Sequence, residues 1–235
     1  MLLTLDAGER PDETEGLWSL FDLLNCACGG HAGDATSMDR VAAFCARSTV
    51  TLGAHPSYPD RPGFGRRSPL QGVPHANLAA RVREVAALVE PAVAGQCRAL
   101  VDIARRRGVV VAAMKPHGAL YHDANAHAPI AQALIRGAID ALGRGVTIVG
   151  PPAGALRDEA AQLRLLYARE GFADRRLRSD GTLAPRDDDD ALILDPAEAA
   201  AQAAVLASSV DTIGIHADTP GAIDVARAVR AAVRG

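Results

Sequence analysis

Residues 49–66 read TVTLGAHPSYPDRPGFGR. The opening TVTLGA is β-branched and apolar, which predicts a buried strand. The prolines and glycines after it are typical of a loop. A loop does not also need a histidine, an aspartate and two arginines, yet this one carries His55, Asp60, Arg61 and Arg66. The stretch therefore indicates either a decorated surface loop or a strand end that contributes to a site.

The same arrangement recurs along the chain. Seven apolar runs predict strands at residues 2–6, 22–27, 49–54, 109–115, 145–149, 163–168 and 211–216. Periodic patterns predict helices at residues 36–45, 77–90, 95–107, 127–142, 196–207 and 220–233. Strand–helix alternation over seven units implies a parallel sheet with helices outside it, and 235 residues is a normal length for one barrel. We expect an α/β protein with a single-domain (β/α) barrel over residues 1–235, TIM-like with seven strands.

Local signals refine this pattern. Thr36-x-x-Asp39 looks like an acidic capping box that opens a helix. Pro91 predicts a break or kink between two amphipathic stretches. Residues 171–194 interrupt the alternation, and their turn residues indicate an extra hairpin or a lid. The aspartates at 187–190 are best interpreted as a solvated loop.

Composition excludes several classes of protein. Hydrophobic residues make up 49% and the net charge is −3, so the chain is not disordered by composition and gives no reason to expect a nucleic-acid partner. The N-terminus, MLLTLDAGERPDE, lacks a basic region, so we expect no signal peptide. No apolar run approaches the roughly 18 residues that span a bilayer, so we expect no membrane association. Cys26, Cys28, Cys45 and Cys97 form no spaced framework and are expected as reduced thiols in a cytoplasmic protein.

Polar residues follow six of the seven predicted strands. They are Asp6, Glu9, Asn25, His31, Asp34, His55, Asp60, Arg61, Lys115, His117, Tyr121, Glu170, Asp174, Arg175, His216 and Asp218. In a closed parallel barrel all carboxyl ends of the strands open on one face, and that face carries the active site. Because polar residues follow six strands that end on the same face, an active site is favoured over six unrelated polar surface loops.

The glycine-rich turn CGGHAGD at residues 28–34 has two interpretations. Backbone N–H groups of Gly29–Gly33, with His31 beside them, could bind an anion at a helix N-terminus. The alternative is a tight turn with Asp34 near the helix cap.

Lys115-Pro-His117-Gly is the sharpest motif. A lysine that ends the run VVVAAMK lies where a strand reaches the face of the barrel that carries the site, and a buried lysine there requires a partner of opposite charge. It could hold a phosphate or an oxyanion, with His117 as acid or base. The alternative is a structural lysine–aspartate pair.

Residues at other strand ends could also have either a functional or a purely structural role. His216-x-Asp218 could be a general base with its orienter, a metal-ligand pair or an ordinary turn. Asp6 and Glu9 could supply a base or an N-terminal cap. Cys26-x-Cys28 has no second pair, so structural zinc is not expected. The sequence contains no GxxxxGK[ST], GxSxG or HExxH, and no GxGxxG after the first strand, so ATP is not expected to bind through a P-loop.

Seven segments of the sequence together match one family. They are LDAGE (5–9), NCACGGHAGD (25–34), GAHPSYPDRPGFGR (53–66), KPHGALY (115–121), EGFADR (170–175), DGTLAPR (180–186) and IHAD (215–218). In this order, over nearly the whole chain, they resemble the LamB/YcsF family of bacterial 5-oxoprolinase A subunits. The resemblance implies a seven-stranded (β/α) barrel related to the glycoside hydrolase and sugar deacetylase barrels.

The resemblance also implies an activity. It is the ATP-dependent opening of 5-oxo-L-proline (pyroglutamate) to L-glutamate, in a complex with two partner subunits, B and C. ATP would arrive with Mg²⁺; a further bound divalent metal and a homodimer are left open. Phosphorylating the lactam oxygen would make the ring carbon electrophilic, which requires cations, a base for water and an acid for the ring nitrogen.

The residue roles follow as hypotheses from the same resemblance. The catalytic candidates are Asp6, His55, Lys115 and His117. The candidates for binding substrate or phosphate are Glu9, Asn25, Gly29, His31, Asp34, Asp60, Arg61, Tyr121, Asp174, Arg175, Arg186, His216 and Asp218. Within these sets, Lys115 and Arg61 would hold phosphate or the substrate carboxylate, and His55 and His117 would act as acid and base.

The chain departs from the family pattern at several positions. Thr4 stands where the family has asparagine, and Gly30 replaces a bulkier residue. Leu177 stands where tyrosine is usual, and Ala217 separates His216 from Asp218. These departures put substrate identity and rate in question but leave the core motifs intact.

Two rival functions remain. A stand-alone metal-dependent deacetylase or amidohydrolase could use Asp6, His31, His55 and His216 as metal ligands around a water. A non-catalytic member of a carboxylase-like complex would bind its partners without turnover.

Overall fold

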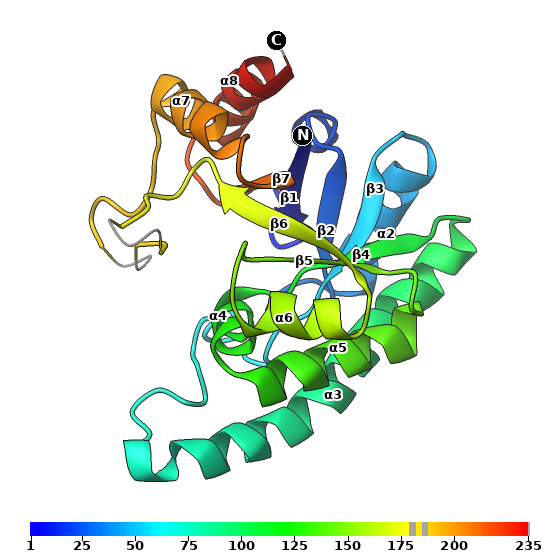
Figure 1. The fold of residues 1–235 in the computed structure, drawn as a ribbon. Coiled ribbons are helices and arrows are strands. Elements are labelled where there is room, and N and C mark those ends of the chain that lie inside the picture. The colour runs from blue at the N-terminus through cyan, green and yellow to red at the C-terminus, as the bar shows by residue number, and fades with distance from the viewer. Residues whose placement is uncertain (179–181, 185–187, 235) are drawn as a thin grey trace.

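The computed structural model describes residues 1–178, 182–184 and 188–234. Within them, seven parallel strands close into a barrel in chain order, with β7 pairing back onto β1. The strands are β1 (Leu2–Ala7), β2 (Leu23–Ala27), β3 (Thr51–His55), β4 (Val111–Met114), β5 (Thr147–Gly150), β6 (Leu166–Phe172) and β7 (Thr212–His216). The predicted (β/α) barrel with seven strands is therefore confirmed (Figure 1).

Helices surround this barrel. They are α1 (Glu15–Trp18), α2 (Ala35–Ala46), α3 (His75–Arg106), α4 (Gly118–Ala126), α5 (Ala128–Leu142), α6 (Ala155–Gln162), α7 (Pro196–Leu206) and α8 (Ala222–Arg234). The long helix α3 packs along α5, and α7 packs on α8 on the other side of the barrel (Figure 1). Their apolar faces cover the outer faces of the strands and form the main core.

The barrel interior changes character along its axis. Leu23, Ala113 and Val149 form a small apolar cluster apart from the main core. Two residues further along β2, Asn25 lies on the same face of the strand and pairs in register with Asp6. Apolar residues therefore fill the interior below, and polar side chains begin towards the carboxyl ends of the strands.

The sixth strand lies later in the chain than its apolar run predicts. The run at 163–168 suggested the strand, but β6 spans Leu166–Phe172 and Leu166 is exposed. Glu170, expected just after the strand, is part of it and is buried. The prediction failed because Leu163 and Leu165, which lie between α6 and β6, extend the apolar run on its N-terminal side.

Two helix boundaries also differ from the predictions. The capping box of α2 joins Asp34 to Ser37, and Thr36 and Asp39 play no part in it. Of the break or kink predicted at Pro91, the break is wrong, because α3 is one helix of 32 residues with Pro91 inside it. A proline in a helix costs about 3 kcal/mol, and packing of α3 on α5 outweighs that cost. The approach is close here, since a Cβ on Gly137 of α5 would lie 2.5 Å from the carbonyl oxygen of Glu90.

The segment after β6 folds back on itself. Arg175 forms an antiparallel bridge with Leu192, and Leu177 forms one with Leu183. This is consistent with the predicted hairpin at 171–194 as far as the described residues reach. Part of the aspartate run at 187–190 lies outside them. No helix in the described part of the chain is long and apolar enough to span a bilayer.

Candidate active site

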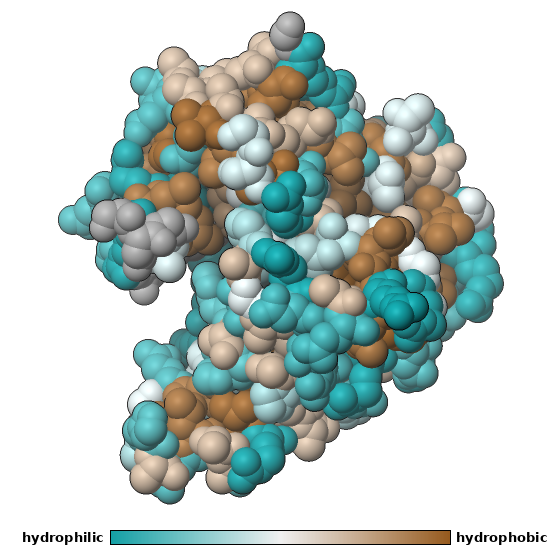
Figure 2. Space-filling view, viewed as in Figure 1, coloured by the Kyte–Doolittle hydropathy of each residue, from teal (hydrophilic) through white to brown (hydrophobic). Residues whose placement is uncertain are grey.

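A cavity of about 400 Å³ lies at the carboxyl ends of the strands. It is lined by Asp6, His55, Arg66, Lys115, Pro116, His117, Gly118, Ala119, Tyr121, His122, Phe172, Arg175, Leu183, Ala184 and His216. Figure 1 shows the cyan segment before α3 and the yellow segment after β6 projecting on the same side of the barrel, and Figure 2 shows a notch in the surface between them. This volume is typical of a site for a small molecule.

A buried charged centre borders the cavity. The Nζ atom of Lys115 donates to Oδ1 and Oδ2 of Asp6 at 2.9 and 3.1 Å, and it lies 2.9 Å from Oε1 of Glu170. Asn25 donates to Asp6 at 3.1 Å, and Thr4 donates to Glu170 at 3.1 Å. All three charged side chains are at most 5% exposed. We call Asp6, Lys115 and Glu170 the charged centre.

The charges within the charged centre shift the pKa values of its three members. Burial opposes the charge of Lys115, but the two carboxylates raise its pKa above the ordinary value. Burial would raise the pKa of Asp6, but the charges of His55 and Lys115 hold it well below the usual range. For Glu170 burial prevails over the lowering by Lys115, and its pKa is raised. The centre therefore holds a permanent cation beside the cavity.

Lys115 is the only lysine among 25 basic residues; the other 24 are arginines. Arginine fills every other cationic position, so a compact ammonium is retained only at this strand end. An ammonium is a point charge that fits between two carboxylates, whereas the broad guanidinium fork does not replace it.

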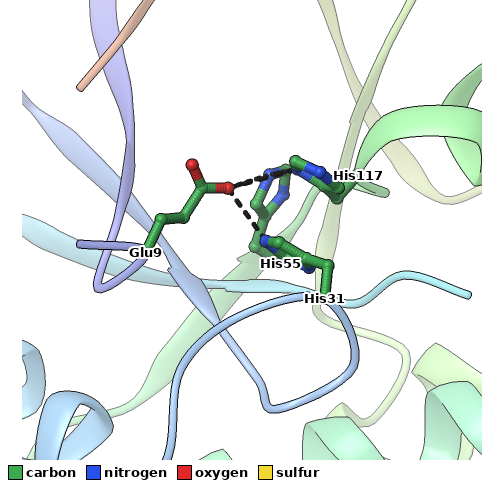
Figure 3. Close-up of side chains that lie close together, drawn as sticks. All are labelled: Glu9, His31, His55 and His117. Atoms are coloured by element: carbon green, nitrogen blue, oxygen red, sulfur yellow. Dashed lines mark hydrogen bonds and ion pairs between the residues drawn. The ribbon is translucent and has the colours of Figure 1, made fainter. Parts of the chain in front are cut away.

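Four other side chains meet next to this centre. Glu9, His31, His55 and His117 come from four separate segments and point toward one another (Figure 3). Oε1 of Glu9 lies 2.9 Å from Nε2 of His31 and 3.2 Å from Nδ1 of His117. Nε2 of His55 lies 3.0 Å from Nδ1 of His117 and 3.7 Å from Oε1 of Glu9. We call these four residues the histidine cluster.

Backbone carbonyls set the orientation of two of these rings. Nδ1 of His55 lies 2.8 Å from the carbonyl oxygen of Lys115, and Nε2 of His117 lies 2.9 Å from that of Phe64. A carbonyl oxygen can only accept, so both of these nitrogens carry the hydrogen. The opposite nitrogens, Nε2 of His55 and Nδ1 of His117, are the ones that face each other.

Burial and charge act differently on the three imidazoles. Burial lowers the pKa of His31 to about 4 and also lowers that of His117. Burial opposes charge on His55 too, but the carboxylate of Asp6, 3.3 Å away, raises its pKa. Burial therefore favours the neutral form of His31 and His117, whereas Asp6 favours the charged form of His55.

A histidine–aspartate pair also borders the cavity, where His216 of β7 pairs in register with Asp6 of β1. Nδ1 of His216 lies 3.0 and 3.1 Å from the carboxylate oxygens of Asp174, which also accepts from the His216 backbone N–H at 2.8 Å and from Thr219 at 2.6 Å. Asp174 is fully buried, and burial would raise its pKa, but His216 and these hydrogen bonds lower it. Nε2 of His216 is left as the nitrogen available to a ligand in the cavity.

Glu13 holds the loop that carries Glu9. Its carboxylate accepts from the backbone N–H groups of Gly8, Glu9 and Arg10 at 2.8, 2.9 and 2.8 Å, and from the indole of Trp18 at 3.0 Å. Sequence reasoning missed this residue, and a glutamate just before a helix gave no distinguishing signal.

Two motif glycines permit the close packing of the cluster. Gly65 has φ +64°, and a Cβ there would lie 2.9 Å from Cβ of His31 and 3.1 Å from Cδ2 of His117. Gly118 has φ +57°, and its Cβ would lie 2.5 Å from the carbonyl oxygen of Gly65. A side chain at either position would be strained and would displace the rings.

Four of the predicted binding residues serve local structure and do not line the cavity. Arg61 donates to the carbonyl oxygens of Gly29 and Gly33 at 3.1 and 2.7 Å. The N–H of Gly29 donates within the turn, to the carbonyl oxygen of Ala32. Asp34 caps α2, and Asp60 accepts from the N–H of Gly63 at 2.9 Å. These contacts hold the glycine-rich turn and the loop after β3 in shape.

The remaining predicted residues lie at the cavity or beside it. Tyr121 and Arg175 line it, and Asn25 supports Asp6 from below. Asp218 forms an ion pair with Arg66 at 3.0 Å on the rim. Arg186 lies outside the described residues.

The structure also brings Glu170, Phe172 and Arg66 to the site, although sequence reasoning gave none of them a catalytic or binding role. Nζ of Lys115 lies 4.9 Å from the centre of the Phe172 ring, and that ring stacks on the ring of His216 at 5.2 Å. Both Glu170 and Phe172 belong to the EGFADR motif. Glu170 was recognised as a polar residue after the sixth strand, but it was given no role in the site.

The departures from the family pattern have local explanations. Thr4 keeps a polar contact through its hydrogen bond to Glu170. A Cβ on Gly30 would lie 2.4 Å from Oε1 of Gln96 and 2.5 Å from Oγ of Ser57, so glycine fits this packing. Leu177 pairs with Leu183 in the segment after β6 and does not line the cavity.

The candidate metal ligands regroup in the structure. Sequence reasoning offered Asp6, His31, His55 and His216. His31 and His55 do lie together, but with Glu9 and His117. Asp6 is engaged by Lys115 and Asn25, and His216 is engaged by Asp174.

Comparison with known proteins identifies the family and supports the fold. The model of the LamB/YcsF family matches residues 11–235. The chain is 40% identical to the 5-oxoprolinase A subunit of Methylococcus capsulatus, over 97% of this chain and 90% of the relative. It is 36% identical to the 5-oxoprolinase A subunit of Chloroflexus aggregans, over 97% and 92% of the two chains. The crystal structure of a lactam utilization protein from Thermus thermophilus superimposes with a TM-score of 0.82 at 30% identity, covering 99% of this chain and 95% of that one.

Proposed function

The chain belongs to the LamB/YcsF family, and from this premise we propose that it is the A subunit of a 5-oxoprolinase, with residues 1–235 as one catalytic domain. The reaction is the ATP-dependent hydrolytic opening of 5-oxo-L-proline to L-glutamate. The observation that carries the proposal is a small-molecule cavity bordered by a buried ammonium and by four imidazoles. Similarity to proteins named for this activity supplies the substrate.

The chemistry of a lactam explains the need for ATP. Resonance in the amide lowers the reactivity of the ring carbonyl carbon. Transfer of the γ-phosphoryl group of ATP to the lactam oxygen releases ADP and makes that carbon electrophilic. A first water then adds, the C–N bond breaks and the ring nitrogen takes up a proton. A second water hydrolyses the resulting acyl phosphate to glutamate and phosphate.

The groups around the cavity match these demands. Lys115 supplies a fixed positive charge for the lactam oxygen or the phosphoryl group. His55 and His117 supply the nitrogen pair at which water is activated, and Asp6 orients both Lys115 and His55. His216, held by Asp174, delivers the proton to the ring nitrogen.

Two arginines are better placed than Arg61 for the substrate carboxylate. Arg66 and Arg175 both line the cavity. Arg61 is occupied by the carbonyl oxygens of the glycine-rich turn. We therefore assign the carboxylate to Arg66 or Arg175, and Arg61 acts by holding the turn.

Partner subunits complete the proposal. The relatives carry the name of an A subunit, which implies an assembly, and we assign two partners, B and C, to it. The sequence contains no P-loop, so ATP with Mg²⁺ would be bound by other contacts, including those that the partners provide. A homodimer of this chain stays a prediction.

One observation favours a second function. The histidine cluster could hold a catalytic metal, which would suit a stand-alone metal-dependent amidohydrolase or deacetylase. Such an enzyme would act on lactams or N-acetyl compounds without ATP and without partner subunits.

Glutamate release from 5-oxoproline tests the proposal. The purified chain is assayed with and without ATP, and with and without its two partner subunits. We expect glutamate only when ATP and both partners are present, and a large loss of its formation when the chain carries Lys115→Met. Glutamate formed without ATP would favour the amidohydrolase. No glutamate from a verified complex would exclude this substrate. Full activity with Lys115→Met would assign this chain a non-catalytic role.

A further inference from the structure

We propose that Glu9, His31, His55 and His117 bind a first-row transition-metal dication, with Zn²⁺ as the reference ion. The proposal deepens the proposed function at the same site, and its role in catalysis rests on that function. The binding of the metal does not.

The first support is the spacing of the ligand atoms. The four candidate ligand atoms all lie within 4.8 Å of one another. A metal about 2.1 Å from each nitrogen and oxygen places neighbouring ligand atoms about 3–3.5 Å apart. The contacts of 2.9 to 3.2 Å that join Glu9 to His31 and His117 fit that spacing after a small expansion. Figure 3 shows the three rings grouped around one carboxylate oxygen of Glu9, with the four residues coming from separate segments.

The second support is the orientation of the histidines. Metal-binding histidines usually donate their other ring N–H to a backbone carbonyl or a carboxylate, which fixes the ring and its tautomer. His55 does so to Lys115 and His117 does so to Phe64. Their remaining nitrogens face each other at 3.0 Å. Two lone pairs at this distance require a proton or a metal cation between them.

The third support is the balance of formal charge. With their carboxylates ionised, Asp6, Glu9 and Glu170 contribute three negative charges, and Lys115 contributes one positive charge. The difference is −2 when the imidazoles are neutral. A dication would bring this buried assembly to zero, and buried charge is costly when it is not compensated.

The donor set selects the class of metal. Three imidazoles and one carboxylate suit Zn²⁺ and its first-row neighbours, whereas Mg²⁺ and Ca²⁺ prefer oxygen ligands. The metal would thus be distinct from the Mg²⁺ that accompanies ATP. Because His55 and His117 also line the cavity, a ligand position open to the cavity could take up a water or the lactam oxygen.

Metal binding is measured directly. The chain is purified without chelators, its metal content is determined by elemental analysis, and the chelator-treated protein is titrated with Zn²⁺ and with Co²⁺. Visible absorption of Co²⁺ reports its coordination, and thermal unfolding reports stabilisation. We expect one equivalent per chain, and a loss of affinity of at least about 100-fold in His117→Gln.

Two variants keep the test decisive. Glu9→Gln retains an oxygen acceptor and volume while removing the charge, and it should also weaken binding. His75→Gln is the matched control, because His75 is exposed at the start of α3. Absence of Zn²⁺ binding by the wild type, or wild-type affinity in both cluster variants, would overturn the proposal. If His117→Gln does not fold, the wild-type titration and Glu9→Gln decide.

The outcome is separable from that of the proposed function. Stoichiometric Zn²⁺ binding without glutamate formation would establish the metal site and exclude 5-oxoproline as the substrate. Full glutamate formation by a complex that contains Mg²⁺ and no transition metal would uphold the oxoprolinase and remove the metal from its mechanism; Zn²⁺ binding by the chain would still be decided by the titration.

Discussion

The charged centre and the histidine cluster lie side by side under one cavity, but they are balanced in different ways. In the charged centre, Lys115 is held between Asp6 and Glu170, so the cation is part of the protein. In the histidine cluster, Glu9 faces nitrogens that burial keeps largely neutral, and the chain supplies no permanent cation. The difference indicates that the first group is complete without a ligand, whereas the second is prepared for a proton or a metal.

Lys115→Met tests the completeness of the charged centre and has the largest expected effect. Removing the ammonium leaves two buried carboxylates unpaired, which should cost about 3–5 kcal/mol in the free energy of unfolding. Glutamate formation should fall about 100- to 1,000-fold. Denaturant unfolding and the coupled assay measure both.

The matched control for that change is Arg169→Met, at an exposed ion pair. Arg169 pairs with Asp211, but both side chains are about two-fifths exposed. This substitution should cost at most about 1 kcal/mol. Equal losses in the two variants would contradict the special role of the buried centre.

Asp174→Asn separates positioning of His216 from binding of the substrate. The amide keeps the shape but loses the charge that holds Nδ1 of His216. We expect kcat to fall about 100-fold with KM little changed, and stability to fall by about 1–3 kcal/mol. A change confined to KM would show that His216 binds substrate without transferring a proton.

Glu9→Gln in metal-free protein tests the histidine cluster itself. The amide oxygen of glutamine can still accept a hydrogen bond. Because the metal-free cluster holds no permanent cation that needs the charge of Glu9, the free energy of unfolding should fall by only about 1 kcal/mol. Adding Zn²⁺ should stabilise the wild type more than the variant. A metal-free loss as large as that of Lys115→Met would mean that the two groups are balanced alike.

The last test changes only the pH, and it follows the protonation of Lys115. At ordinary pH we expect no change in its charge. Because it is the only lysine, ¹⁵N-lysine labelling gives one side-chain signal. Its pKa is raised in the folded chain, so its contribution to stability is fully present below the ordinary lysine pKa of about 10.4 and is lost as pH rises above it. The signal should therefore stay that of an ammonium up to a pH of about 10.4, whereas loss of the proton at or below that pH would contradict the ion pairs.

The barrel could be predicted because its signal is periodic. Apolar runs followed by polar strand ends, as in TVTLGAH, indicated both the strand count and the face that carries the site. His55, Lys115 and His117 were recognised because they end such runs. The comparisons do not test the individual roles assigned to these residues, which stay predictions.

Other features depend on contacts that a linear pattern does not contain. Glu170 was expected just after the sixth strand, because the apolar run before β6 began too early, and the sequence did not indicate its contact with Lys115. Arg61 was read as an anion ligand, but the carbonyl oxygens of Gly29 and Gly33, in a turn much earlier in the chain, engage its guanidinium. Glu13 became recognisable only when its three backbone donors were visible.

The most direct test of the central claim is the position of bound 5-oxoproline. Activity alone does not show which subunit holds the substrate, so the assembled complex is crystallised with 5-oxoproline in the absence of ATP. We predict that the ring occupies the cavity, with the lactam oxygen near Lys115 or the histidine cluster and the ring nitrogen toward His216. Substrate bound to a partner subunit, or in this chain at the groove lined by Tyr58, Leu88 and Leu120, would contradict the claim that this cavity is the site of ring opening.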